Sequence, residues 1–180
     1  MTLTTSRLLL RRFNETDLAF IETLGTTPLY HQTAGFAKIQ SEVQGQQILN
    51  VYQRRTESYL IITQKKKKKI GLIELNERSV DPQSELYATR ELGFLLLQSA
   101  WGQGYMTEAV TALLDDAFPR LQLREIWAGH YENNQRSAIF LQKMGFQYRY
   151  EVTLPFYFFE QTVEKYYLLT VSDWQRFRNK

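Results

Sequence analysis

The chain has 180 residues, of which 43% are hydrophobic, and a formal net charge of +3 at pH 7. This length suits one domain, residues 1–180, with a sizeable core, and the composition is neither that of a disordered chain nor that of a membrane protein. No apolar run approaches the ~18 residues of a spanning helix, and the lack of cysteine excludes a disulfide framework and a cysteine nucleophile.

The first third of the chain predicts one strand followed by helices. Residues 7–13 have the apolar centre of a strand, and Asn14 then begins a helix, with Asp17 three positions later as the second residue of a short capping box. Gly25 and Pro28 are expected to end this helix. The segment 29–40 is irregular, with room for a short helix, and Ser41 is a good N-cap for the next one.

A lysine run, Lys65–Lys69, separates two predicted strands at 58–64 and 70–75, which together indicate a hairpin. Five adjacent lysines most often form a solvated turn. The alternative is attachment to ribosomal RNA or to an acidic partner. Because no aromatic or arginine residues interleave with the lysines, we favour the solvated turn and expect no specific nucleic-acid partner.

The most informative stretch is Ser99–Ala109, between a predicted strand at 85–97 and a helix with an apolar stripe that Pro119 is expected to stop. A glycine turn that opens a helix presents unpaired backbone N–H groups and the positive end of a helix dipole, and these together form an anion site. Gly102 and Gly104 let a phosphate approach the main chain closely. The short G-x-G is by itself equally compatible with a plain tight turn.

A second strand–turn–helix unit follows, with a strand at 124–131 and a helix within Asn133–Phe146. Two such units in succession predict a parallel strand pair at the centre of an otherwise antiparallel sheet. Strands at 147–153 and 163–171 complete that sheet. The aromatic segment between them, Leu154–Phe159 with its core Phe156–Phe159, would line an acceptor site, form a subunit contact or simply pack.

These two motifs resemble the GNAT superfamily of acyl-CoA-dependent N-acetyltransferases, and within it the RimJ/RimL-type enzymes that acetylate protein N-termini. That branch has roughly W-G-x-G-Y-x-T-E-A, then N-x-x-S followed by K-x-G-F. The similar stretches here are Trp101–Ala109, Asn134 with Ser137, Lys143–Phe146, Ser6–Arg11 and Tyr166–Trp174. The resemblance implies an α/β (α+β) fold: a single GNAT-like domain whose mixed, mostly antiparallel sheet of six to seven strands has a central, splayed parallel pair, flanked by about four helices.

The resemblance also implies acetyl-CoA as the donor, with its diphosphate on the main-chain amides of the turn and its pantetheine paired with the preceding strand. A strand N–H near Leu95 would polarise the thioester carbonyl. Two positions depart from the superfamily pattern: Ser99 replaces a frequent Gln or Arg, and Leu141 replaces a tyrosine proposed as the acid, which leaves Ser137 as the matched group near the sulfur. The implied donor-binding residues are Leu95, Leu96, Leu97, Gly102, Gln103, Gly104, Tyr105, Met106, Thr107, Asn134 and Ser137. For Asn134, a plain helix N-cap is the alternative.

The acceptor must be a neutral amine. At pH 7 an α-amine is about one-tenth neutral, whereas a lysine amine is neutral in less than about one part in 10³, so an N-terminal acceptor asks less of a general base. Glu91 matches an acidic position frequent in the family and is the first candidate base, with Ser137 beside the sulfur as the second catalytic candidate. Glu74 ranks behind Glu91, and Glu108 is expected to support the turn. The candidates for lining the acceptor pocket are Tyr30, His31, Phe36 and Glu74, for each of which plain packing is as good an interpretation.

His31 and His130 are the only histidines and lie far apart in the sequence, so we expect no metal centre. The expected function is therefore acetyl transfer from acetyl-CoA to a primary amine. The first-choice acceptor is the α-amine of a protein N-terminus, such as that of a ribosomal protein. An acetyltransferase of small amines and a non-catalytic acyl-CoA-binding module are the alternatives. We also expect a cytoplasmic location and no membrane partner; a homodimer, common in the family, is left open.

Overall fold

The computed structural model describes residues 1–154 and 162–179. Within these residues eight strands form one sheet, in the hydrogen-bonded order β1-β2-β3-β4-β5-β6-β8-β7. The chain divides into two compact units: an N-terminal unit of Met1–Glu74 and Phe94–Leu113, and a C-terminal unit of Leu75–Gly93 and Leu114–Lys180. That residues 1–180 are a single domain stays a prediction.

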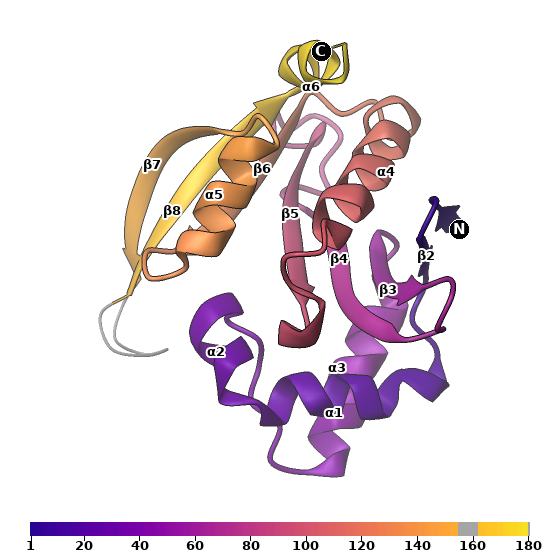
Figure 1. Cartoon of the computed structure of the whole chain (residues 1–180). Coiled ribbons are helices and arrows are strands. Elements are labelled where there is room, and N and C mark those ends of the chain that lie inside the picture. The colour runs from indigo at the N-terminus through magenta and orange to yellow at the C-terminus, as the bar shows by residue number, and fades with distance from the viewer. Residues whose placement is uncertain (155–161, 180) are drawn as a thin grey trace. The chain divides into compact units, whose positions relative to one another are not determined.

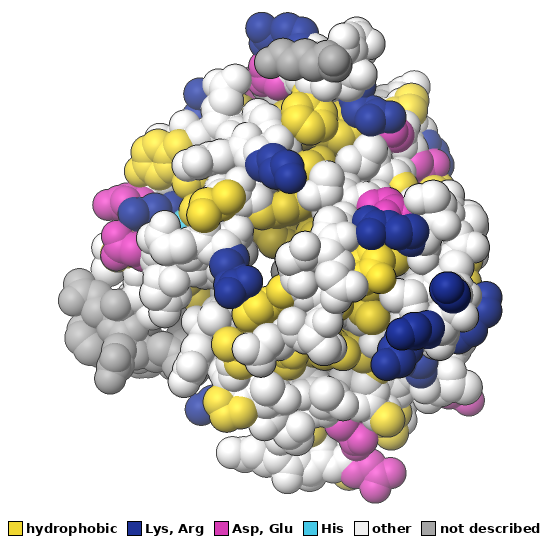
Figure 2. Space-filling model, viewed as in Figure 1, with side chains coloured by type: hydrophobic (Ala, Val, Ile, Leu, Met, Phe, Trp, Pro, Cys, Tyr) yellow, Lys and Arg dark blue, Asp and Glu magenta, His cyan; other side chains and the backbone are white. Residues whose placement is uncertain are grey.

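The sheet of the N-terminal unit is antiparallel from β1 (Thr2–Thr4) through β2 (Leu8–Arg11) and β3 (Ser58–Thr63) to β4 (Lys69–Glu77). The predicted hairpin of β3 and β4 is confirmed. Its lysine turn is exposed from Lys65 to Lys68, and Figure 2 shows Lys and Arg side chains gathered over this part of the unit. Lys69 belongs to β4 and forms an ion pair with Asp17 at 2.8 Å.

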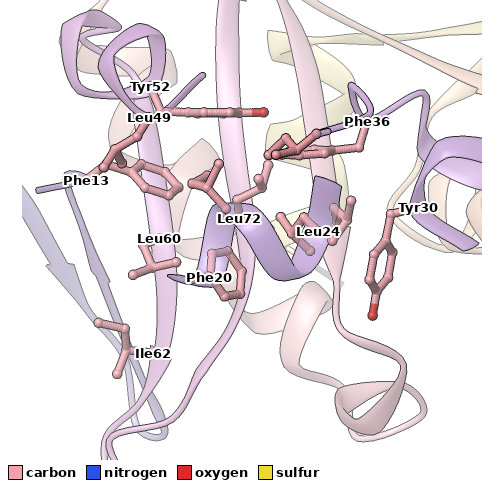
Figure 3. Packing of buried hydrophobic residues seen from close by; sticks show 13 residues of the cluster. Phe13, Phe20, Leu24, Tyr30, Phe36, Leu49, Tyr52, Leu60, Ile62 and Leu72 are labelled. Carbon is pink, nitrogen blue, oxygen red and sulfur yellow. The ribbon is translucent and has the colours of Figure 1, made fainter. Parts of the chain in front are cut away.

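Four short helical segments of this unit carry the buried side chains that cover the sheet. They are η1 (Glu15–Asp17), α1 (Leu18–Thr26), α2 (Pro28–Ala34) and α3 (Glu42–Arg54), and Figure 1 shows α1 and α3 side by side. The capping box at Asn14 and the Ser41 cap are confirmed. The core they form is shown in Figure 3 and includes Phe13, Phe20, Leu24, Tyr30, Phe36, Leu49, Tyr52, Leu60, Ile62 and Leu72.

Two prolines act differently from the prediction. Pro28 begins α2 instead of only ending the helix before it, because the first turn of a helix needs no N–H from its first residue and favours the fixed φ of proline. Pro119 lies inside the last turn of α4 (Tyr105–Arg120), which ends one residue after the proline that was expected to stop it. A proline this close to the helix end removes only one hydrogen bond from a turn that already frays.

In the C-terminal unit, β5 (Thr89–Leu96) begins a parallel ladder with β6 (Glu125–Tyr131), and Glu91 pairs with Trp127. The strand β8 (Thr162–Thr170) is antiparallel to both β6 and β7 (Gln147–Leu154). Helix α5 (Gln135–Lys143) lies over β6 and β8 in Figure 1, and α6 (Val171–Arg178) follows β8 directly. The predicted α/β class, the mostly antiparallel sheet and the parallel pair are confirmed.

The structure also extends the predicted pattern. It has six α-helices and eight strands within the described residues. β1 and α6 add to the expected elements, and α2 is the short helix for which the segment 29–40 left room. The strand expected at 85–97 begins only at Thr89, after a series of turns. Of the aromatic segment Leu154–Phe159, only Leu154 is described, as the last residue of β7. None of the described helices is both long and apolar enough to cross a membrane.

Candidate active site

The glycine turn joins the end of β5 to α4 in the N-terminal unit. Between them lie the short helix η2 (Gln98–Ala100) and the residues 101–104. The Trp101 indole Nε1–H donates to the Leu96 carbonyl at 3.0 Å, which fixes the turn to the strand it follows. Gly102 and Gly104 have φ values of +72° and +76°, the left-handed region that glycine adopts at little cost. A Cβ at Gly102 would meet open space, so the turn leaves room beside its main chain.

The turn presents several backbone donors in the same place. The first helical hydrogen bond of α4 runs from the Glu108 N–H to the Gly104 carbonyl at 3.1 Å. The amides of Tyr105, Met106 and Thr107 precede it and have no partner within the helix. A helix dipole adds only about 0.3–2 kcal/mol, so an anion bound here depends on several N–H groups acting together. The residues fit a diphosphate.

The end of β5 shows which of its amides can bind a ligand. The Leu97 N–H donates to the Ile70 carbonyl of β4 at 2.8 Å, and the Leu95 carbonyl lies against Gly71 of the same strand. Since alternate residues of a strand point their polar groups to opposite sides, the Leu96 N–H points away from β4. Leu96 therefore carries the amide near Leu95 that is directed away from β4, and its role as a donor to the thioester stays a prediction.

The predicted pair on α5 is in place, in the C-terminal unit. The Asn134 Oδ1 atom accepts from the Ser137 N–H at 3.1 Å and so caps the helix, as the plain interpretation of Asn134 requires. Ser137 is half-buried in the first turn of this helix. Binding of pantetheine by either residue stays a prediction.

Glu91 lies on β5 in the same unit and is half-buried. Burial first, and then the charges of Glu164 and Glu91, raise the pKa of Tyr166. The Tyr166 hydroxyl donates to Glu164 Oε2 at 3.0 Å, and its ring stacks on that of Tyr150 with centroids 5.2 Å apart. Glu91 therefore belongs to a group of carboxylates and aromatic rings on this sheet, which the sequence analysis did not find. The alternation of Glu164 and Tyr166 along β8 was the only available signal.

Two arginines of the same unit, Arg90 and Arg124, contact carboxylate and carbonyl groups. The Arg90 guanidinium lies 3.6 Å from Glu77 and donates to the carbonyls of Tyr87 and Thr89. Arg124 donates to the carbonyl of Glu85 at 3.2 Å. The role of Glu91 as a base stays a prediction.

Glu74, the second carboxylate, is neutralised within the N-terminal unit. Arg55 forms an ion pair with Glu74 at 2.6 Å, and the Glu74 side chain is only 11% exposed. Burial and the charge of Glu74 raise the pKa of Tyr52. Glu74 is thus engaged by Arg55, and its rank behind Glu91 as a candidate base stays a prediction.

Three of the four predicted pocket residues, Tyr30, His31 and Phe36, are buried in or next to α2. The Tyr30 hydroxyl accepts from the Gln98 N–H at 3.1 Å, which connects α2 to η2. The His31 Nδ1 atom is 2.6 Å from the Phe36 carbonyl, which makes it the protonated ring nitrogen. The Phe36 ring stacks on Tyr52. These contacts are those of packing residues, and contact with an acceptor stays a prediction.

In the described part of the chain no group of three or more His, Cys, Asp or Glu residues could hold a metal ion. The second histidine, His130, packs against the Tyr167 ring at 5.4 Å and its Nδ1 atom lies 2.8 Å from the Tyr131 carbonyl.

Comparison with known proteins agrees with this geometry. The model of the acetyltransferase (GNAT) domain matches residues 7–147, which include the turn, β5, Asn134 and Ser137. The chain belongs to the GNAT acetyltransferase family. It is therefore an N-acetyltransferase by family.

Solved structures share the fold of this GNAT chain over nearly its whole length. A GNAT-family acetyltransferase from Bacillus anthracis has a TM-score of 0.81 at 19% identity, covering 94% of this chain and 98% of its own. An acetyltransferase from Salmonella typhimurium that modifies the N-terminal serine of ribosomal protein L7/L12 has a TM-score of 0.78 at 17% identity, covering 95% and 99%. A putative ribosomal-protein-serine acetyltransferase from Vibrio cholerae has a TM-score of 0.75 at 19% identity, covering 94% and 97%.

Proposed function

We propose that this GNAT protein transfers the acetyl group of acetyl-CoA directly to a primary amine, with a protein N-terminal α-amine as the preferred acceptor. The observation that carries the proposal is the turn before α4. Its two glycines have positive φ, the side of Gly102 is open, and three successive amides lack helical partners. This is the arrangement that binds phosphate groups at helix N-termini.

The donor site extends from this turn along the end of β5. The amides of residues 102–107 hold the diphosphate, and residues 95–97 pair with pantetheine as an added strand would. The Leu96 N–H is the group that polarises the thioester carbonyl. Asn134 and Ser137 hydrogen-bond the pantetheine and the sulfur. When bound, acetyl-CoA supplies an acyl group already activated as a thioester.

The acceptor side needs only modest proton chemistry. Glu91 accepts a proton from the acceptor amine, directly or through water. The leaving thiol has an ordinary pKa near ~8.5, so it departs without a strong acid, and Leu141 in place of the usual tyrosine is consistent with that. Positioning two reactants together then accounts for most of the acceleration.

The preference for protein N-termini rests on the sequence resemblance to the RimJ/RimL branch and on the neighbours from Salmonella typhimurium and Vibrio cholerae, whose descriptions name ribosomal-protein substrates. A cytoplasmic location and a protein substrate belong to the same proposal. Small amines are the second class of acceptor to test.

Two measurements test the proposal. Calorimetry on the purified protein should show saturable binding of CoA. A CoA-release assay should then show turnover with peptides that begin with Ser or Ala, faster than with polyamines, aminoglycosides or amino-acid amides. Turnover only with small amines would replace the protein acceptor by the small-amine alternative. Binding without turnover on any amine would leave a non-catalytic acyl-CoA-binding module, and a lack of any heat from CoA would refute the donor site.

A further inference from the structure

Arg7 and its neighbours fasten the start of the chain to the first turn of α4. The Glu108 carboxylate accepts hydrogen bonds from the Thr5 hydroxyl at 2.5 Å, the Ser6 hydroxyl at 3.1 Å and the Arg7 backbone N–H at 2.9 Å. The Arg7 Nε–H completes the set with a 2.6 Å ion pair. Burial raises the pKa of Glu108, but these hydrogen bonds outweigh it and lower the pKa, so the carboxylate is ionised at neutral pH.

The same guanidinium also holds the glycine turn. Its Nη1 atom donates to the Gln103 carbonyl at 2.9 Å, and its Cζ atom lies 4.7 Å from the centre of the Tyr105 ring. Its Nη2 atom is 3.4 Å from the position of a Cβ at Gly104. One side chain thus contacts the turn at Gln103 and Tyr105 and lies beside Gly104, while Glu108 fixes its orientation.

The bond to the Gln103 carbonyl determines where the next amide points. In a trans peptide the C=O and N–H groups point in opposite directions. Holding the Gln103 carbonyl toward Arg7 therefore turns the Gly104 N–H to the opposite side of the chain. Without this bond the peptide between Gln103 and Gly104 could rotate, because the glycines on either side of Gln103 tolerate several conformations.

We propose that Arg7 is a positioning residue for the donor: it presets the amides of the glycine turn to receive the diphosphate, and it neutralises Glu108, whose charge would otherwise repel that group. This inference rests on the proposed CoA site. It concerns only how the turn is held, since Arg7 lies on the side of the peptide away from the Gly104 N–H.

The test is a kinetic comparison of the wild type with Arg7→Met, using two donors. With acetyl-CoA, the variant should show a KM raised about 10-fold to 100-fold, the loss expected for charge-assisted hydrogen bonds, and a kcat changed less than about threefold. With acetyl-pantetheine, which lacks the diphosphate, kcat/KM should not change. Arg7→Lys keeps the charge but cannot bridge two acceptors in the same way, so it should recover only part of the acetyl-CoA affinity.

Arg120→Met is the matched control, because Arg120 pairs with Asp116 at 2.8 Å near the other end of α4. This control should leave both donors unaffected. Equal KM values for wild type and Arg7→Met, full recovery by Arg7→Lys, or a parallel loss with both donors would each overturn the inference. A wild-type protein that binds no CoA would instead refute the proposed function.

Discussion

Glu91 shares its surroundings with a second carboxylate, Glu164, and the half-buried phenol of Tyr166. The Tyr166 hydroxyl is held by Glu164, and its raised pKa keeps it protonated throughout the neutral range. Tyr166 is therefore a hydrogen-bond donor in this group and not a proton acceptor. Of the two carboxylates ranked as candidate bases, Glu74 is held by Arg55 at 2.6 Å.

Glu91→Gln should lower kcat/KM for a peptide acceptor by about 10²-fold to 10⁴-fold, the usual contribution of a general base. The substitution keeps the shape of the side chain, so the Kd for CoA measured by calorimetry should not change. Glu77→Gln is the control, because Glu77 is a half-exposed carboxylate on β4 at 3.6 Å from Arg90 and has no proposed catalytic role. Full activity of Glu91→Gln would exclude Glu91 as the base.

Single residues were predictable where their partners are close in sequence. Asn14 and Ser41 cap helices as predicted, and Asn134 caps one as its alternative interpretation required, because a cap bonds to an amide only two or three positions away. The role of Arg7 was not predictable in this way. It is 101 positions from Glu108, and no local pattern specifies a contact over that distance.

At the scale of elements, the turn before α4 is the part of the fold that the proposed function depends on most. Gly104→Val places a β-branched side chain at a φ of +76°, a conformation that such residues rarely adopt. The added side chain would also approach the Arg7 guanidinium. We expect CoA binding to be lost in calorimetry, with a stability cost of about 1–2 kcal/mol in chemical denaturation.

Gly145→Val is the matched control for this prediction. Gly145 has a φ of +88° after α5, so valine there meets the same backbone strain without touching the turn. This variant should lose similar stability yet bind CoA as the wild type does. If Gly104→Val retained its CoA affinity, the diphosphate could not lie on this turn.

The elements themselves were predictable in proportion to the strength of their local signals. Both strand–turn–helix units have long apolar stripes and glycine or asparagine turns, and both were found. Two missed elements have weak signals: β1 has only three residues, and α6 has eight with a single fully buried residue, Trp174. The strand expected from residue 85 begins at Thr89 because Pro82 and its polar neighbours continue as turns up to that point.

At the scale of the whole molecule, one buried carboxylate joins three segments of the N-terminal unit. The Asp17 side chain is fully buried. It accepts a bidentate pair from Arg11 of β2 at 2.7 and 2.8 Å, and it forms an ion pair with Lys69 of β4 at 2.8 Å. The Asn14 N–H adds a fourth bond at 2.9 Å. The order of β2, η1 and β4 in space thus depends on a charge that the sequence analysis recognised only as half of a capping box.

Asp17→Asn should therefore lower the free energy of unfolding by about 3 kcal/mol, because it leaves two cations without their buried anion.

Burial raises the pKa of Asp17, but the hydrogen bonds from Arg11, Lys69 and Asn14 outweigh it, so the pKa in the folded state is lowered. A lowered pKa contributes stability that is complete above the unfolded value of about 3.9 and is lost as the pH falls below it. Urea denaturation between pH 7 and pH 3 should show a steeper loss of stability at the acidic end for the wild type than for Asp17→Asn.

Asp116→Asn, which breaks only the surface pair with Arg120, should change stability by less than about 1 kcal/mol and keep the wild-type pH dependence. Parallel pH curves for wild type and Asp17→Asn would mean that this carboxylate is not what holds the three segments together.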